Sequence, residues 1–268
     1  MNNEAPIGIF DSGVGGLTVA HAIHTILPNE KIIYFGDTKH LPYGNKPDEQ
    51  IKYYSKKIVK FLIQKNCKII VVACNSASAV AFEELKNIIK NKCLIINVID
   101  PVINYVTNQP DIKNIGIIGT TATISSNIYE KLIKKNRTDL NVHSLATPLL
   151  ASLIEKGDSQ KNKTKVLETY LNDEKLKKID SLILGCTHYP LIENQINIFY
   201  KQNILLISSI KHIGVMIHNL LHNKKLLNTS KNNIQHNFYV SNYTLNFQQK
   251  TELFFSSAIN LEEENIFS

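Results

Sequence analysis

The stretch IIVVACNSASA (residues 69–79) joins an unbroken apolar run to a cysteine, Cys74, and then to small polar residues. Continuous runs of isoleucine and valine are typical of parallel strands that helices cover on both faces, whereas strands with one wet face alternate apolar and polar residues. A second stretch, LILGCTHYP (residues 182–190), has the same pattern and ends its apolar run at Cys186. Each stretch therefore predicts a buried strand that ends in a thiol.

Strand-like and helix-like segments alternate before both cysteines. The first half reads IGIF (7–10), an amphipathic segment, KIIYFG (31–36) and a helical segment, QIKYYSKKIVKFLIQK (50–65). The rhythm restarts at residue 114, where IGIIGTTATI (115–124) echoes IGIFDSGVGG (7–16). The repetition predicts an α/β fold of two pseudo-symmetric three-layer domains with mainly parallel sheets. Because ligands of such sheets bind outside the carboxyl ends of the strands, we expect the active site in the cleft between the domains.

Composition narrows the function classes. The chain has 268 residues, of which 43% are hydrophobic and 20% charged, as in a globular protein of one large or two modest domains. The formal net charge is +7, but the lysines are scattered, so nucleic acid is not an expected partner. The start has no signal-peptide pattern, and no apolar run approaches the roughly 18 residues of a spanning helix. We therefore expect a cytoplasmic protein with no membrane partner.

Four cysteines occur, and two of them have distinctive surroundings. No CxxC pair or zinc-ligand spacing is present, so free thiols are expected in a reducing compartment. Cys67 and Cys93 stand beside lysines at the edges of apolar runs, which is typical of buried small hydrophobic residues. Cys74 and Cys186 instead lead from a strand into a helix start, where the helix dipole favours a thiolate. A thiol placed there can act as a base near neutral pH.

Other polar residues are expected at the same sheet edges. His188 follows Cys186 by two positions, and Asp11 ends the first strand within the glycine-rich FDSGVGGLTV (10–19). That segment matches neither common phosphate-loop pattern, so it is either a ligand loop or only a tight turn. For the remaining candidates an ordinary turn or a helix N-cap is the alternative; they are Ser12, Pro42, Tyr43, Gly44, Asn75, Ser76, Thr120, Thr123 and Thr187.

Histidines are the remaining candidates for metal ligands. His21 and His24, and likewise His218 and His222, have spacings that place both rings on one side of a helix. No acidic residue or cysteine joins either pair in the pattern that zinc sites use. No metal site is expected.

Six motifs, in order, resemble those of the cofactor-independent glutamate racemases of the aspartate/glutamate racemase superfamily. They span about residues 8–192 and read FDSGVGGLTV, DTKHLPYG, ACNSASA, GTTATISS, ATPLLASLIEKG and LGCTHYPLI. The chain has ACNS where the family usually has ACNT, and Ser208 precedes Ser209 where relatives commonly carry an aspartate. The resemblance implies L- and D-glutamate as substrates, no cofactor and a supply of D-glutamate for peptidoglycan. It also allows a homodimer, because such racemases are often dimers.

The resemblance further implies domain limits and residue roles. Residues 1–97 and about 208–268 would form the first domain, and residues 98–207 the second. Cys74 would remove the α-proton of D-glutamate while Cys186 delivers one to the opposite face, with Asp11 and His188 assisting. The residues that would hold the substrate are Asp11, Ser12, Pro42, Tyr43, Gly44, Asn75, Ser76, Thr120, Thr123, Thr187 and His188.

Other functions stay open at this point. A racemase for aspartate or another amino acid is disfavoured by the motifs DSGVGG and PYG together. A non-catalytic module could use the glycine-rich loop to bind an anionic metabolite. A cysteine hydrolase would leave the second thiol without a role. The pattern does not place the segment NNIQHNFYVSNYTL (232–245).

Overall fold

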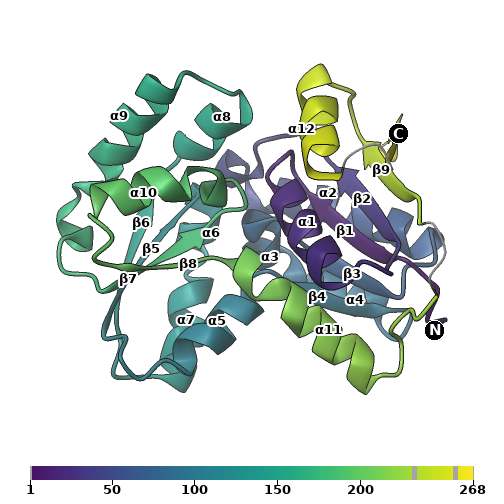
Figure 1. Cartoon of the computed structure of the whole chain (residues 1–268), viewed down its shortest axis with the longest axis horizontal. Coiled ribbons are helices and arrows are strands. Elements are labelled where there is room, and N and C mark those ends of the chain that lie inside the picture. Colours follow the sequence, from purple (N-terminus) through teal and green to yellow (C-terminus); the bar gives the residue numbers. More distant parts are fainter. Residues whose placement is uncertain (1, 231–233, 256–258, 268) are drawn as a thin grey trace.

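The computed structural model describes residues 2–230, 234–255 and 259–267. Within these ranges six strands form one sheet in the order β10-β9-β2-β1-β3-β4, and all neighbouring strands are parallel. We call the body around this sheet the first domain (Figure 1). Its strands are β1 (Ile7–Asp11), β2 (Ile32–Gly36), β3 (Ile69–Val72), β4 (Leu94–Asn97), β9 (His236–Val240) and β10 (Ile259–Glu263).

A second sheet in the described ranges has four strands in the order β6-β5-β7-β8, again all parallel. The body around it, the second domain, lies beside the first in Figure 1. The prediction of an α/β fold with two mainly parallel sheets is therefore confirmed. The strands are β5 (Asn114–Gly119), β6 (Asn141–Ala146), β7 (Ser181–Gly185) and β8 (Leu205–Ile207).

The two sheets place their cysteines at equivalent positions. β3, which leads to Cys74, pairs with β1, and β7, which leads to Cys186, pairs with β5. β1 ends at Asp11 and β5 is followed by Thr120. Because parallel strands end at a common edge, each domain gathers its candidate residues at one side of its sheet.

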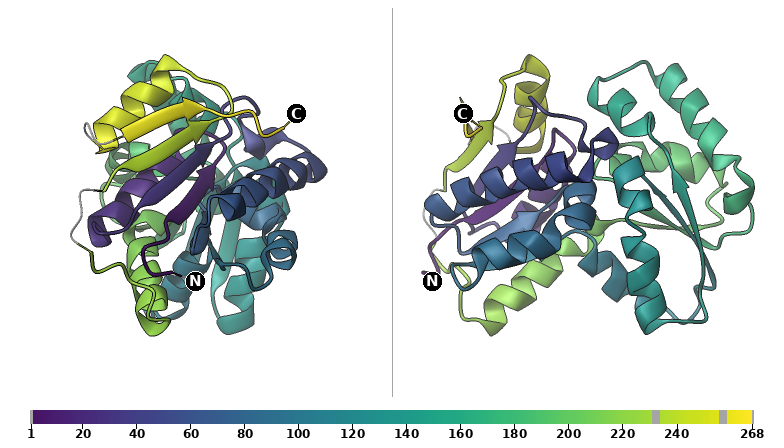
Figure 2. Two further views of the ribbon diagram at one scale, coloured as in Figure 1. Left: turned by 90° about the vertical axis from the view of Figure 1, so that its right-hand side faces the viewer. Right: turned by 180° about the vertical axis from the view of Figure 1, so that it is seen from behind.

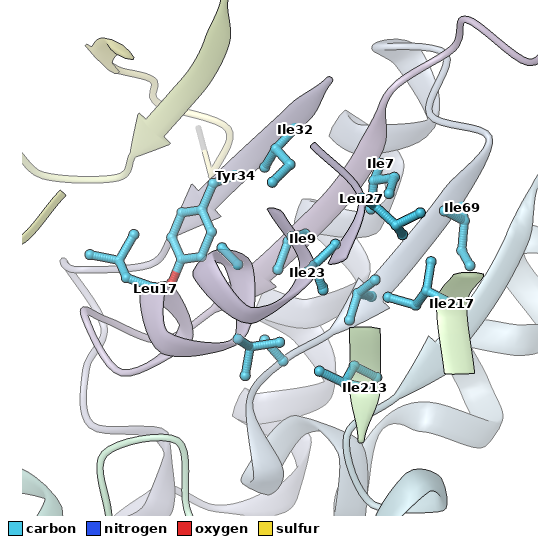
Figure 3. Close-up of a cluster of buried hydrophobic side chains, with 14 of the residues drawn as sticks. Ile7, Ile9, Leu17, Ile23, Leu27, Ile32, Tyr34, Ile69, Ile213 and Ile217 are labelled. Atoms are coloured by element: carbon cyan, nitrogen blue, oxygen red, sulfur yellow. The ribbon is translucent and has the colours of Figure 1, made fainter. Parts of the chain in front are cut away.

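Helices cover both faces of the first sheet, which explains its unbroken apolar strands. Ile7 and Ile9 of β1 pack beneath α1 and α11 (Figure 3), whereas Phe10 belongs to the cluster on the opposite face. Figure 2 shows α2 lying across that opposite face when the molecule is seen from behind. On the first face lie α1 (Gly16–Ile26), α11 (Ile213–Asn223) and α12 (Leu245–Phe255), and on the other α2 (Asp48–Gln64), α3 (Asn75–Val80) and α4 (Phe82–Ile89).

The second sheet is covered in the same way, with two separate apolar clusters on its two faces. On one face lie α5 (Asp100–Thr107) and α7 (Ile128–Asn136), and on the other α8 (Leu150–Glu155), α9 (Gln160–Leu171) and α10 (Glu193–Phe199). The short helix α6 (Thr121–Ser125) follows β5 directly. The described residues also form short 3₁₀ helices, which are η1 (Tyr43–Asn45), η2 (Glu174–Leu176), η3 (Tyr189–Ile192) and η4 (Ser209–Lys211).

After β8 the chain returns to the first domain through η4 and α11, and β9 then pairs with β2. The segment 232–245, which the sequence pattern did not place, contains β9; its residues 232 and 233 lie outside the described ranges. We propose domain boundaries at 97/98 and about 207/208, because β5 to β8 alone make up the second sheet. Among the helices of the described residues, none has the length and apolar character needed to cross a membrane.

Candidate active site

Both candidate thiols are almost fully buried at the carboxyl ends of equivalent strands. Cys74 is the N-cap residue of α3 and is 5% exposed, and Cys186 follows β7 and is 6% exposed. The neighbour of Cys74 bridges the two domains, because the Asn75 side-chain amide donates a hydrogen bond of 2.8 Å to the Tyr129 hydroxyl on α7. The residues that follow the two cysteines, Asn75 and Thr187, both contact the other domain.

Burial raises the pKa of Cys74. The negative charge of Asp11 raises it further, and that of Cys186 adds a smaller increase. A backbone hydrogen bond from Ala77 and the hydroxyl of Ser12, 3.9 Å from Sγ, act in the other direction without reversing the shift. The backbone at the start of α3 thus favours the thiolate of Cys74, as expected, but desolvation outweighs this effect.

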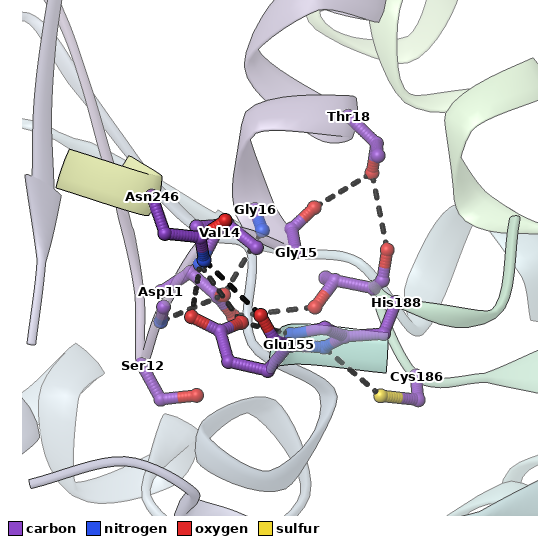
Figure 4. Close-up of polar contacts among 12 residues, drawn as sticks. Asp11, Ser12, Val14, Gly15, Gly16, Thr18, Glu155, Cys186, His188 and Asn246 are labelled. Atoms are coloured by element: carbon purple, nitrogen blue, oxygen red, sulfur yellow. Dashed lines mark hydrogen bonds and ion pairs between the residues drawn. The ribbon is translucent and has the colours of Figure 1, made fainter. Parts of the chain in front are cut away.

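Cys186 heads a hydrogen-bonded chain of three side chains (Figure 4). Its Sγ lies 3.6 Å from Nδ1 of His188, and Nε2 of His188 lies 2.5 Å from Oε2 of Glu155. Burial lowers the pKa of His188, but the hydrogen bonds to Cys186 and Glu155 outweigh it and hold the pKa well above its usual value. A protonated imidazole there can give its proton to the Cys186 thiolate, and the neutral ring can take one back from the thiol.

Asp11 ends β1 in the first domain, and its carboxylate organises the glycine-rich turn. Oδ2 accepts hydrogen bonds from the backbone N–H groups of Gly13 at 3.1 Å and Gly16 at 2.9 Å. Oδ1 accepts a longer one, 3.4 Å, from the hydroxyl of Thr187 in the second domain. Burial raises the pKa of Asp11, although the charge of His188 and both backbone donors lower it. Asp11 thus touches both domains beside Cys74.

Predicted substrate-binding hydroxyls also meet across the domains. Oγ of Ser76, at the start of α3, lies 2.8 Å from Oγ1 of Thr120, which in turn lies 3.0 Å from Oγ1 of Thr123. Gly44 packs over this group, since a Cβ there would come within 2.3 Å of the Thr120 Cβ. The structure therefore brings these four predicted residues together.

The other residues of the predicted loop point elsewhere. Tyr43 is fully buried, and its hydroxyl donates a 2.6 Å hydrogen bond to Oδ2 of Asp37 within the first domain. Pro42 is half-buried and precedes η1. Tyr43 therefore anchors the loop that presents Gly44 rather than turning its hydroxyl toward Cys74.

The glycine-rich turn packs directly on the second domain. A Cβ at Gly15 would lie 2.5 Å from both Nδ1 of His188 and Oγ1 of Thr187, so only glycine permits this approach. The hydroxyl of Thr18 donates to the Gly15 carbonyl at 2.8 Å and to the Thr187 carbonyl at 3.2 Å. The two domains are in close contact around the candidate site.

Two site residues were not predicted from the sequence. Glu155 ends α8 and holds His188, although in the quoted motif ATPLLASLIEKG it looks like one polar position of an amphipathic helix. The sequence signal that could have indicated Glu155 was weak, since it was only a carboxylate directly after an apolar run. Tyr129 lies in a typical helical pattern, and no local signal indicates that its buried hydroxyl meets Asn75.

This fold, with a buried thiol at the equivalent strand end of each domain, is that of an amino-acid racemase, an isomerase. The chain belongs to the Asp/Glu/Hydantoin racemase family, whose sequence profile matches residues 15–212.

Known proteins resemble the chain over nearly its whole length. The glutamate racemase of Streptococcus pneumoniae serotype 19F (strain G54) is 38% identical over 98% of this chain and 98% of that protein. The crystal structure of glutamate racemase from Francisella tularensis in complex with D-glutamate has a TM-score of 0.91 and 38% identity, with 99% of both chains covered. A glutamate racemase isoform from Bacillus anthracis has a TM-score of 0.91 and 34% identity, with 98% of both covered.

Proposed function

We propose that this protein interconverts L- and D-glutamate without a cofactor, by proton transfer between Cys74 and Cys186. The observation that carries the proposal is the pair of buried thiols at equivalent ends of β3 and β7, each followed by a residue that bonds to the other domain. The bound D-glutamate of the similar Francisella protein supports glutamate as the substrate. We further propose that the D-glutamate serves peptidoglycan synthesis.

The reaction needs a base on one face of Cα and an acid on the other. With D-glutamate, the Cys74 thiolate takes the α-proton, and the electron pair of the broken C–H bond stays on Cα as a carbanion. The Cys186 thiol then gives its proton to the opposite face, which yields L-glutamate, a Cys74 thiol and a Cys186 thiolate. The reverse reaction starts from that state, so neither direction consumes a further reactant.

Neighbouring groups adjust the two thiols for these roles. The buried negative charge of Asp11 raises the pKa of Cys74 beyond the effect of burial, which makes its thiolate a stronger base once formed. His188, held by Glu155, can pass a proton to and from Cys186. Exclusion of water from these buried groups strengthens every electrostatic interaction with the carbanion.

The remaining predicted residues would orient the substrate. The Oδ1 atom of Asn75 has no hydrogen-bond partner within the part of the chain that the structure describes, so it is available to accept from an ammonium group. Hydroxyl and backbone N–H groups suit the two carboxylates. These groups come from Ser12, Ser76, Thr120, Thr123, Thr187 and the backbone N–H groups of Tyr43 and Gly44, which Pro42 precedes in the loop.

Isotope exchange tests the proposal on the unmodified protein. In heavy water, either glutamate enantiomer should gain deuterium at Cα as it racemises, because each new C–H bond is made with a thiol proton that has exchanged with solvent. Racemised product without deuterium would contradict proton transfer between two bases.

A racemase for aspartate is the neighbouring candidate, because the family profile covers both acids. The motifs around Asp11 and Tyr43 favour glutamate. Turnover measured on both amino acids at equal concentration decides between them, and faster racemisation of aspartate would replace glutamate in the proposal.

The proposal includes two further properties of the protein, its location in the cell and its oligomeric state. We propose a cytoplasmic enzyme, since its product would be needed where cell-wall precursors are assembled, and a homodimer. Cell fractionation and light scattering of the purified protein measure these two properties.

A further inference from the structure

Glu155 is held by the first domain at two points, although it belongs to the second. Its carboxylate oxygens accept a hydrogen bond from the backbone N–H of Val14, at 3.3 and 3.2 Å. Its main-chain carbonyl accepts a 3.1 Å hydrogen bond from the side-chain amide of Asn246, near the start of α12. Figure 4 shows Val14 and Asn246 approaching Glu155 from the same side, with His188 on the other.

Both contacts from the first domain rest on one aromatic pair. The hydroxyl of Tyr34 donates a 2.8 Å hydrogen bond to the carbonyl of Gly13, next to Val14. Phe247 follows Asn246, and its ring centroid lies 6.0 Å from the ring centroid of Tyr34. Both side chains are fully buried. The two contacts on Glu155 therefore belong to one rigid part of the first domain.

Glu155 needs such support because it is the last residue of α8, a helix of six residues. The final carbonyl groups of a helix have no partner inside the helix, so a side-chain donor there fixes the orientation of the helix end. The Asn246 amide supplies that donor from the other domain.

We propose that Asn246 is a positioning residue for racemisation. Together with the Val14 N–H it aligns Glu155 on His188, so that the chain Cys186, His188, Glu155 is complete only when the first domain is closed on α8. The inference rests on the proposed function, in which Cys186 exchanges a proton with the substrate. Asn246 itself touches none of the reacting atoms and acts through Glu155.

The test replaces Asn246 and follows proton transfer at each thiol separately. Asn246→Ala should lower kcat by about 3- to 10-fold, the effect of losing one hydrogen bond. Because Cys186 takes the proton of L-glutamate, the primary isotope effect with α-deuterated L-glutamate should increase. With α-deuterated D-glutamate, whose proton goes to Cys74, it should stay equal or fall. Asn246→Asp has a side chain of the same size but without the donor. It should change each isotope effect in the same direction as Asn246→Ala does.

Gln249→Ala is the matched control, because Gln249 is exposed on the same helix. It should keep the wild-type kcat and isotope effects. Unchanged kinetics in both Asn246 variants would overturn the proposal, and so would equal changes of the two isotope effects, which indicate a general loss of structure. If instead Cys186→Ala still racemised glutamate, the proposed function would fail, whatever the Asn246 variants do.

Discussion

Cys74 and Cys186 occupy equivalent ends of two similar sheets, yet the groups around them differ. Cys74 has a hydroxyl, Ser12, and a carboxylate, Asp11, as its neighbours, whereas Cys186 has an imidazole that a second carboxylate holds. The backbone repeat thus places two thiols symmetrically, and unrelated side chains give each one its own proton chemistry. The comparison separates what the fold supplies from what individual residues supply.

The largest expected effect follows from removing either thiol of the pair Cys74 and Cys186. Cys74→Ala and Cys186→Ala should each reduce racemisation by about 10³-fold or more, since each removes an essential acid or base. Cys93→Ala is the control, because this thiol is also buried but precedes β4 and so lies at the opposite edge of the sheet from Cys74. Racemisation of both glutamate enantiomers, followed by circular dichroism, measures the effect. A thiol whose loss leaves most of the activity has no place in the mechanism.

A smaller loss is expected when the domains are held apart at Cys186. In Gly15→Ala the new Cβ meets His188 and Thr187 at 2.5 Å, so the first domain must shift away. A misplacement of about 1 Å costs on the order of 10²-fold in rate. Steady-state kinetics decide, and full activity in Gly15→Ala would mean that this close contact is not part of the active state.

Glu155→Gln sharpens the comparison, because it removes the carboxylate that holds His188 beside Cys186. The hydrogen bonds to Cys186 and Glu155 raise the pKa of His188 against burial, so removing the negative partner should lower that pKa. The protonated imidazole is then lost at a lower pH, and the alkaline limb of the profile of kcat against pH should move to lower pH. We expect about a tenfold lower kcat as well. An alkaline limb at the wild-type position would show that Glu155 does not set the proton affinity of His188.

The smallest effect concerns a thiol outside the site. Burial, and then the charge of Cys93, raises the pKa of Cys67 to about 12. A raised pKa in the folded state gives stability that is present below the pKa of the unfolded thiol, about 8.5, and is lost as pH rises toward 12. The unfolding free energy of the wild type should therefore fall faster above pH 9 than that of Cys67→Ala in urea titrations. Parallel pH dependences would contradict the shift.

Much of the site could be predicted from local sequence. Cys74, Cys186 and Asp11 each end a strand, and parallel strands of one sheet end at a common edge, so no knowledge of the domain arrangement is needed. His188 is two positions from Cys186 and shares its surroundings. The α/β rhythm predicted both sheets for the same reason, because continuous apolar runs follow directly from burial on two faces.

The missing parts depend on contacts between distant segments. Glu155 and Asn246 are separated by 91 positions and meet only because the domains close, and β9 pairs with β2, which lies far earlier in the chain. The direction of the Cys74 pKa shift could not be predicted either, because local sequence indicates a helix start but not how deeply the thiol is buried. The hydroxyl of Tyr43 meets Asp37, a pairing set by the fold of the loop.

The most direct test of two thiols on opposite faces of one carbon is enantiomer-specific exchange in heavy water. In Cys186→Ala, Cys74 can still remove and return the α-proton of D-glutamate, so deuterium should enter D-glutamate and not L-glutamate. Cys74→Ala should show the reverse preference. If both variants exchanged the same enantiomer, the two sulfurs would not flank the substrate, and the account would be wrong.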